Sequence, residues 1–161
     1  MRLSSHRARY FFGFIAIVLL LAGSLYLEYF KGVMPCPLCI LQRIDMIVLG
    51  ILFLIGAAFR LRSCGQIILS SLTGLISLAG IAFAGRQVWL QHHPIDNNAD
   101  CGVSLSYLMH ALPMDQVVTK VLSGTAECAQ TGWQFISLSL AEWSLIWFVL
   151  FLIFSMTQLK K

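Results

Sequence analysis

The feature that most constrains this chain is a set of four long apolar stretches, at about residues 10–27, 44–59, 67–84 and 143–156. A helix that crosses a bilayer needs about 20 mostly apolar residues. The first and third stretches meet this length, and the second and fourth meet it when extended a few residues upstream. Because lipid offers backbone groups no hydrogen-bond partner, each stretch is predicted to be helical.

Composition agrees with a membrane protein. Hydrophobic residues make up 58% of the 161 residues and charged residues only 11%, whereas soluble domains carry roughly 25% charged residues. This excludes an ordinary soluble enzyme, a disordered chain and a nucleic-acid-binding protein with a broad basic surface, so no nucleic-acid partner is expected. We predict an all-α integral membrane protein, a four-transmembrane-helix bundle embedded in the lipid bilayer, as one domain over residues 1–161.

The first stretch has an alternative interpretation. Arg2, Arg7 and Arg9 precede it, and basic residues before an apolar run also describe a signal peptide. The run is longer than the apolar part of a usual signal peptide, and no Ala-x-Ala cleavage site follows it. A membrane span is therefore the favoured interpretation.

Basic residues predict the orientation. Four spans place two loops, at about residues 28–43 and 89–141, on the side opposite both termini. Lysine and arginine concentrate on the cytoplasmic side of membrane proteins. Both termini are therefore predicted to be cytoplasmic, because seven of the 11 basic residues lie on their side, namely Arg2, Arg7, Arg9, Arg60, Arg62, Lys160 and Lys161.

The five cysteines divide unevenly across this topology. Cys36, Cys39, Cys101 and Cys128 lie in or beside the two outward loops, and Cys64 lies on the cytoplasmic side. Disulfides persist in oxidising compartments such as the periplasm. The outward set is therefore predicted to form two disulfides, with Cys64 left as a thiol.

Cys36 and Cys39 form a CxxC pair at the expected start of the second helix. Such pairs often carry a reactive thiolate, and the helix N-terminus favours negative charge on sulfur. Arg43 follows Cys39 by four residues, so both can lie on one helix face. A redox role is favoured over a static one for this pair.

Two alternatives remain for the cysteines. Cys101 and Cys128 alone fit a structural disulfide within a long loop. The four outward thiols also fit a zinc site, although Cys101 and Cys128 are separated by 26 intervening residues and do not form a second CxxC. A redox pair needs an electron acceptor, and the chain has no GxGxxG or P-loop motif. By elimination, a lipid-soluble quinone is predicted as acceptor, and no metal.

The chain resembles the DsbB family of disulfide bond formation proteins from Gram-negative bacteria. The resemblance rests on the block MPCPLCILQR, on Cys101 and Cys128, and on the segment LPMDQVVTKVLSGTAECA. It implies a four-helix protein of the bacterial inner membrane. Its implied activity is reoxidation of a periplasmic thioredoxin-like dithiol oxidase of the DsbA type, with electrons passed to ubiquinone or menaquinone.

The resemblance also implies roles for the four outward cysteines. Cys101 would be attacked by the partner's thiolate, and Cys128 would pass the reducing equivalents to Cys36. Cys39 would face the quinone as a thiolate.

Two further residues match family positions near the quinone. Arg43 would support the Cys39 thiolate and polarise the quinone, and His92 would lie near it. His92 has an alternative as an interfacial residue that hydrogen-bonds to a loop, and Arg86 and Gln87 are interpreted as interface anchors.

Two competing hypotheses remain. One is a non-enzymatic membrane scaffold held by static disulfides. The other is the quinone-linked thiol chemistry of vitamin K epoxide reductase, which is disfavoured because its loop cysteines precede the CxxC, whereas here they follow it.

Overall fold

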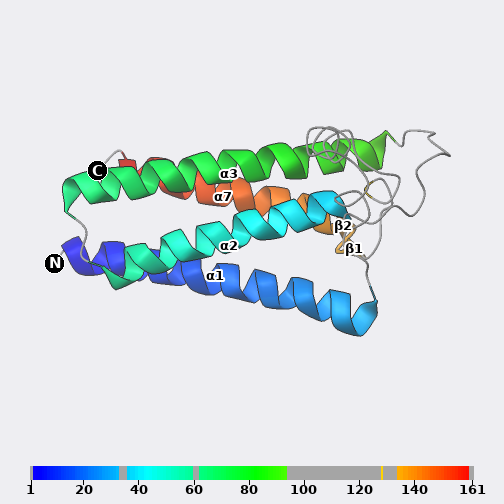
Figure 1. Ribbon diagram of the computed structural model, residues 1–161, viewed down its shortest axis with the longest axis horizontal. Helices are drawn as coiled ribbons and strands as arrows, with labels where there is room; N and C mark the ends of the chain where they lie inside the picture. The colour runs from blue at the N-terminus through cyan, green and yellow to red at the C-terminus, as the bar shows by residue number, and fades with distance from the viewer. Residues whose placement is uncertain (1, 33–35, 60–61, 94–127, 129–133, 160–161) are drawn as a thin grey trace, which may run out of the picture.

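The computed structural model describes residues 2–32, 36–59, 62–93, 128 and 134–159. In these residues the chain forms four long helices and one hairpin (Figure 1). The elements in chain order are α1 (Arg2–Lys31), α2 (Pro37–Ala58), α3 (Ser63–His92), β1 (Gln134–Phe135), β2 (Leu138–Ser139) and α7 (Leu140–Leu159). All four helices are long and apolar enough to cross a membrane, which confirms the predicted all-α, four-helix membrane architecture.

The helices extend beyond the apolar stretches that predicted them. Since α1 continues to Lys31 and α2 begins at Pro37, residues 32–36 make the first connection, where a loop over 28–43 was expected. In the same way, α3 continues to His92 and α7 begins at Leu140, both inside the loop expected at 89–141. Cys101 lies outside the described residues.

Neighbouring helices pack in chain order, α1 on α2, α2 on α3, and α3 on α7. Figure 1 shows both chain termini at one end of the bundle, with the end of α2 and the start of α3 at the same end. We call this the terminal end, and the opposite end, where α2 starts after Cys36, the cysteine end. Cys64 is exposed at the start of α3, at the terminal end.

Toward the terminal end, glycines let large rings approach a neighbouring helix. A Cβ on Gly13 would collide with the ring of Phe53, and one on Gly56 would lie 2.7 Å from the ring of Tyr10. Tyr10 hydrogen-bonds to Ser70 across 3.2 Å, and both are buried. In lipid, helices associate through close packing and interhelical hydrogen bonds, so this half of the bundle is tightly joined.

The hairpin connects the cysteine end to α7. Its two turn residues, Ile136 and Ser137, have φ values of 54° and 61°, as a tight two-residue hairpin turn requires. The backbone N–H of Ser139 donates to Glu142 Oε2 at 2.6 Å, and the N–H of Glu142 donates to Ser139 Oγ at 3.3 Å. This reciprocal capping box starts α7.

Candidate redox site

The CxxC pair lies at the N-terminus of α2. Cys36 is the N-cap and Pro37 opens the helix, where its missing N–H costs nothing and its fixed φ suits the first turn. One helical turn brings the sulfurs of Cys36 and Cys39 to 2.9 Å, and the backbone N–H of Cys39 donates to Cys36 Sγ at 3.4 Å. The pair is therefore placed by the helix start, as its spacing predicted.

Cys128 joins this pair from the distant part of the chain. It is 0% exposed and belongs to the same buried cluster as Cys36, Leu38 and Leu90. A hydrogen bond with Cys128 raises the pKa of the Cys36 thiol, and the hydrogen bond with Cys39 and burial raise it further. Three of the four cysteines that the sequence predicted on the outward side thus meet at one site, where Cys36 contacts both Cys128 and Cys39.

Two buried glutamines complete the surroundings of the sulfurs. Gln87 on α3 is 4% exposed, and its Nε2 donates to Cys39 Sγ at 3.1 Å and to Cys36 Sγ at 3.5 Å. Gln42 on α2 is 5% exposed, and its Nε2 donates to Gln87 Oε1 at 2.7 Å. The interpretation of Gln87 as an interface anchor is therefore wrong, because the side chain points into the bundle against the sulfurs.

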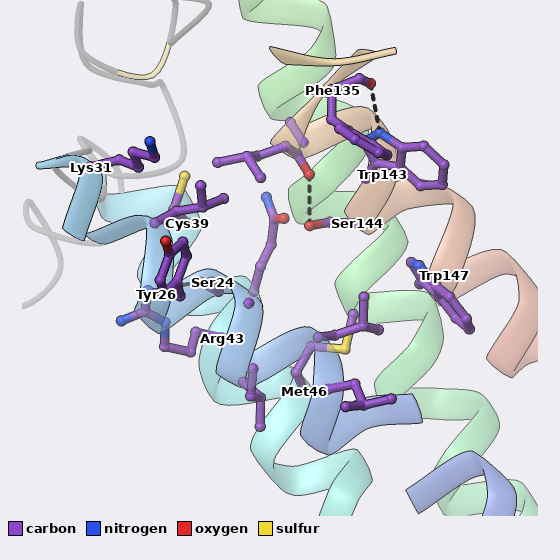
Figure 2. A pocket seen from close by; sticks show the side chains of 18 residues that line it. Ser24, Tyr26, Lys31, Cys39, Arg43, Met46, Phe135, Trp143, Ser144 and Trp147 are labelled. Atoms are coloured by element: carbon purple, nitrogen blue, oxygen red, sulfur yellow. Dashed lines mark hydrogen bonds between the residues drawn. The ribbon is translucent and has the colours of Figure 1, made fainter. Parts of the chain in front are cut away.

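A cavity of about 520 Å³ opens beside Cys39 between α1, α2 and α7 (Figure 2). Its wall is mainly apolar, with leucines of α1, Met46 of α2 and the indoles of Trp143 and Trp147 of α7. The indole Nε1 of Trp143 donates to the carbonyl of Phe135 at 3.1 Å, so the hairpin closes one side. Among the described cysteines, Cys39 is the one that borders this mainly apolar cavity.

Arg43 lines the same cavity as Cys39, as expected from their spacing of four residues. Its Nη1 lies 2.7 Å from Glu28 Oε2, and its Nη2 donates to Ser24 Oγ at 2.9 Å. Both partners belong to α1, so the guanidinium joins α1 to α2 at the cavity wall. A carboxylate at this distance offsets part of the positive charge that the sequence predicted beside Cys39.

His92 has a different position from Cys39 and Arg43. It is exposed near the C-terminus of α3, where its Nδ1 lies 2.9 Å from the Val88 carbonyl oxygen of its own helix. Among the described residues that line the cavity, His92 is absent. The predicted role of His92 stays a prediction.

Sequence reasoning missed the residues that contact the sulfurs and the arginine from other helices. Gln42 had a usable signal, because it follows Cys39 by three residues and so shares its helix face. Gln87 and Glu28 had none, since their partners are 48 and 15 residues away in the chain. Within the described part of the chain, no group of His, Cys, Asp and Glu is arranged to hold a metal ion.

The chain is similar to known disulfide bond formation proteins over nearly its whole length. The sequence model for disulfide bond formation protein DsbB matches residues 6–158. Disulfide bond formation protein B 1 of Pseudomonas aeruginosa is 46% identical over 161 residues, covering 100% of this chain and 99% of the relative. Disulfide bond formation protein B of Stutzerimonas stutzeri is 41% identical over the same shares.

A more distant relative gives the same result. Disulfide bond formation protein B of Methylococcus capsulatus is 37% identical over 158 residues, covering 98% of this chain and 96% of the relative. No solved structure shows a significant match. With its CxxC pair at a helix start and four helices able to cross a membrane, this chain belongs to the DsbB family of disulfide bond formation proteins.

Proposed function

We propose that this chain is a membrane thiol oxidase that reoxidises a periplasmic DsbA-type dithiol oxidase and passes the electrons to a membrane quinone. The observation that carries the proposal is the order of the buried groups. Cys128 adjoins Cys36, Cys36 adjoins Cys39, and Cys39 borders an apolar cavity. A relay needs this order, because thiol–disulfide exchange requires direct contact between the reacting sulfurs.

The first exchange oxidises the partner. One partner thiolate attacks Cys101, the Cys101–Cys128 bond breaks, and Cys128 leaves as a thiolate. The partner's second thiolate then attacks its own mixed-disulfide sulfur and displaces Cys101. The partner has lost two electrons and two protons, and Cys101 and Cys128 have gained them as a dithiol.

The second exchange moves the electrons inward. The Cys128 thiolate attacks Cys36, the Cys36–Cys39 bond breaks, and Cys39 leaves as a thiolate. Cys101 then attacks Cys128, which restores the Cys101–Cys128 disulfide and releases Cys36. Because its pKa is raised, Cys36 takes up a proton on release, and a protonated thiol does not attack the restored disulfide.

The cavity fits a quinone as electron acceptor. Its size lies within the roughly 300–1,000 Å³ of small-molecule sites, and its mostly apolar wall with a few polar groups is typical of them. Ubiquinone or menaquinone would supply a two-electron, two-proton acceptor there. Cys39 would face that ligand, Arg43 would orient it through charge, and His92 is retained as a proposed contact from α3.

The proposed orientation places the cysteine end in the periplasm and the terminal end in the cytoplasm of a bacterial inner membrane. The full sequence supports it, since seven of its 11 basic residues lie in the two terminal segments and in the connection between α2 and α3. This follows the excess of lysine and arginine on the cytoplasmic side of membrane proteins. It also exposes Cys64 to the reducing compartment, where thiols stay reduced.

The function is tested with purified protein, ubiquinone and a reduced DsbA-type partner. Quinone reduction is followed by ultraviolet absorbance, and partner oxidation by thiol labelling of the same samples. Cys39→Ser is expected to abolish quinone reduction, because the dithiol it needs no longer forms. The matched control is Cys64→Ser, which changes an exposed thiol at the far end and is expected to leave the rate unchanged. Full activity of Cys39→Ser would contradict the mechanism and favour the scaffold hypothesis.

A further inference from the structure

The two buried glutamines beside the CxxC pair form a connected amide system. The nitrogen and the oxygen of the Gln87 amide make their shortest contacts with different groups. Its Nε2 lies 3.1 Å from Cys39 Sγ, and its Oε1 accepts a hydrogen bond of 2.7 Å from Gln42 Nε2. Both glutamines are buried, so water does not compete for these contacts.

The contact with Gln42 determines which end of Gln87 faces the sulfur. A primary amide has two donor hydrogens on nitrogen and an acceptor oxygen. With Gln42 donating to the oxygen, the amide nitrogen of Gln87 remains on the side of Cys39 and Cys36. The Gln42 amide donates to Gln87 and makes no hydrogen bond to either sulfur, so its influence on the sulfurs runs through Gln87.

We propose that Gln87 is the hydrogen-bond donor that stabilises the Cys39 thiolate in the reduced pair, and that Gln42 is the positioning residue that holds the Gln87 amide in this orientation. The inference rests on the proposed function, in which Cys39 leaves as a thiolate. It adds that two uncharged amides inside the bundle support this anion, while Arg43 is paired with Glu28.

The same geometry serves both protonation states of Cys39. A thiolate accepts the hydrogen bond from Nε2 at 3.1 Å, whereas a thiol can donate to Oε1 at 3.6 Å. The shorter contact is the one that serves the thiolate. Hydrogen bonds to charged groups are about twice as strong as those between neutral groups, so Gln87 favours the reduced, ionised form over the disulfide.

The expected consequence is an oxidising CxxC pair. A donor that stabilises the reduced form makes a disulfide a stronger oxidant. Loss of one hydrogen bond to a charged group corresponds to about a tenfold change in an equilibrium constant. For this two-electron couple, a tenfold change equals about 30 mV.

The test measures the equilibrium of the Cys36–Cys39 pair with glutathione in quinone-free, full-length protein, with each cysteine followed by alkylation and peptide mass spectrometry. Gln87→Met preserves side-chain length but removes the donor, and should shift the pair about tenfold toward the disulfide. Gln42→Glu places a carboxylate against Gln87 and draws its amide nitrogen away from the sulfurs, and should shift the pair in the same direction. Gln42→Met removes only the orienting donor and should give a smaller shift, about threefold.

Gln91→Glu is the matched control. Gln91 lies one turn further along α3, and its Oε1 accepts a hydrogen bond from Ser139 Oγ that a carboxylate can also accept. The control should change the equilibrium less than about twofold. An unshifted Gln87→Met protein, or a Gln91→Glu shift equal to that of Gln42→Glu, would overturn the proposal. No quinone or partner enters this assay, so its result is independent of the quinone-reduction assay. If the protein fails to reduce quinone but shows the expected shifts with glutathione, the proposed function is contradicted and this inference is supported.

Discussion

The two halves of helix α1 face different surroundings. In the terminal half, Gly13 lies against the Phe53 ring so closely that any Cβ would collide with it, whereas in the cysteine half nothing lies within 4 Å of a Cβ built on Gly23. Gly23 also lines the cavity, between α1 and α7. One helix therefore holds the bundle together at one end and leaves space for a ligand at the other.

The same difference appears in the polar groups. Toward the terminal end, Ser155 Oγ donates to the Ser70 carbonyl at 2.5 Å, and Tyr10 hydrogen-bonds to the Ser70 hydroxyl. These contacts join three helices. At the cysteine end the buried Gln42 instead donates to Gln87, and Gln87 contacts the sulfurs of Cys36 and Cys39. Buried polar side chains thus join helices in one half and surround the cysteine sulfurs in the other.

The largest stability effect is expected from Gly13→Ala. The Phe53 ring is buried among the rings of Tyr10, Phe151 and Phe154, so it has little room to move. Overpacking of this kind costs about 1–3 kcal/mol. Thermal unfolding in detergent should show the loss.

Gly23→Ala is the control on the same helix. Its new methyl group meets open space, and the free energy of unfolding should change by less than about 1 kcal/mol. Equal destabilisation by both substitutions would show that the two halves of α1 do not differ in packing.

A smaller effect, on reactivity, distinguishes the thiols at the two ends. In the reduced protein Cys36 is buried and its raised pKa keeps it protonated, whereas Cys64 is exposed. Alkylation at neutral pH should therefore modify Cys64 at least about tenfold faster than Cys36, as peptide mass spectrometry can measure.

The pH dependence of stability has a defined sign. The pKa of Cys36 in the folded protein lies above its ordinary value of 9.0. The contribution of this thiol to the free energy of unfolding is therefore complete below that pH. This contribution is lost as the pH rises further, because the thiol then ionises in the unfolded protein but not in the folded one. Reduced protein should therefore unfold more easily above pH 9, and Cys36→Ala should weaken this dependence. A dependence unchanged by that substitution would contradict the assignment.

The smallest effect is expected at the start of α7. Ser139→Ala removes the side-chain half of the capping box and should cost about 1 kcal/mol. Because the hairpin beside it forms one wall of the cavity, the loss should appear first as faster proteolysis near residues 134–139 and only weakly in global unfolding. Ser139→Thr keeps the hydroxyl and serves as the control. Equal proteolysis of the two variants would argue against the cap.

Sequence alone predicted the four membrane-length helices of the described part of the chain, the shared end of the termini, and the CxxC pair at the start of α2. These depend on local properties, namely the length of apolar stretches, the spacing of cysteines, and Pro37 at a helix start. Arg43 was likewise placed on the face of Cys39 by helical spacing alone.

Only the tertiary structure revealed the cavity, the Gln42–Gln87 amide pair and the Arg43–Glu28 ion pair. In a soluble helix, hydrophobic periodicity marks the buried face, but lipid is as apolar as the protein interior. Exposed and buried faces of α2 and α7 are therefore both hydrophobic, and the sequence gives no rotation for either helix. The contacts of Gln87 and Glu28 depend on the rotation of the helices and on where α1 separates from α7. Both of these are determined by packing between helices.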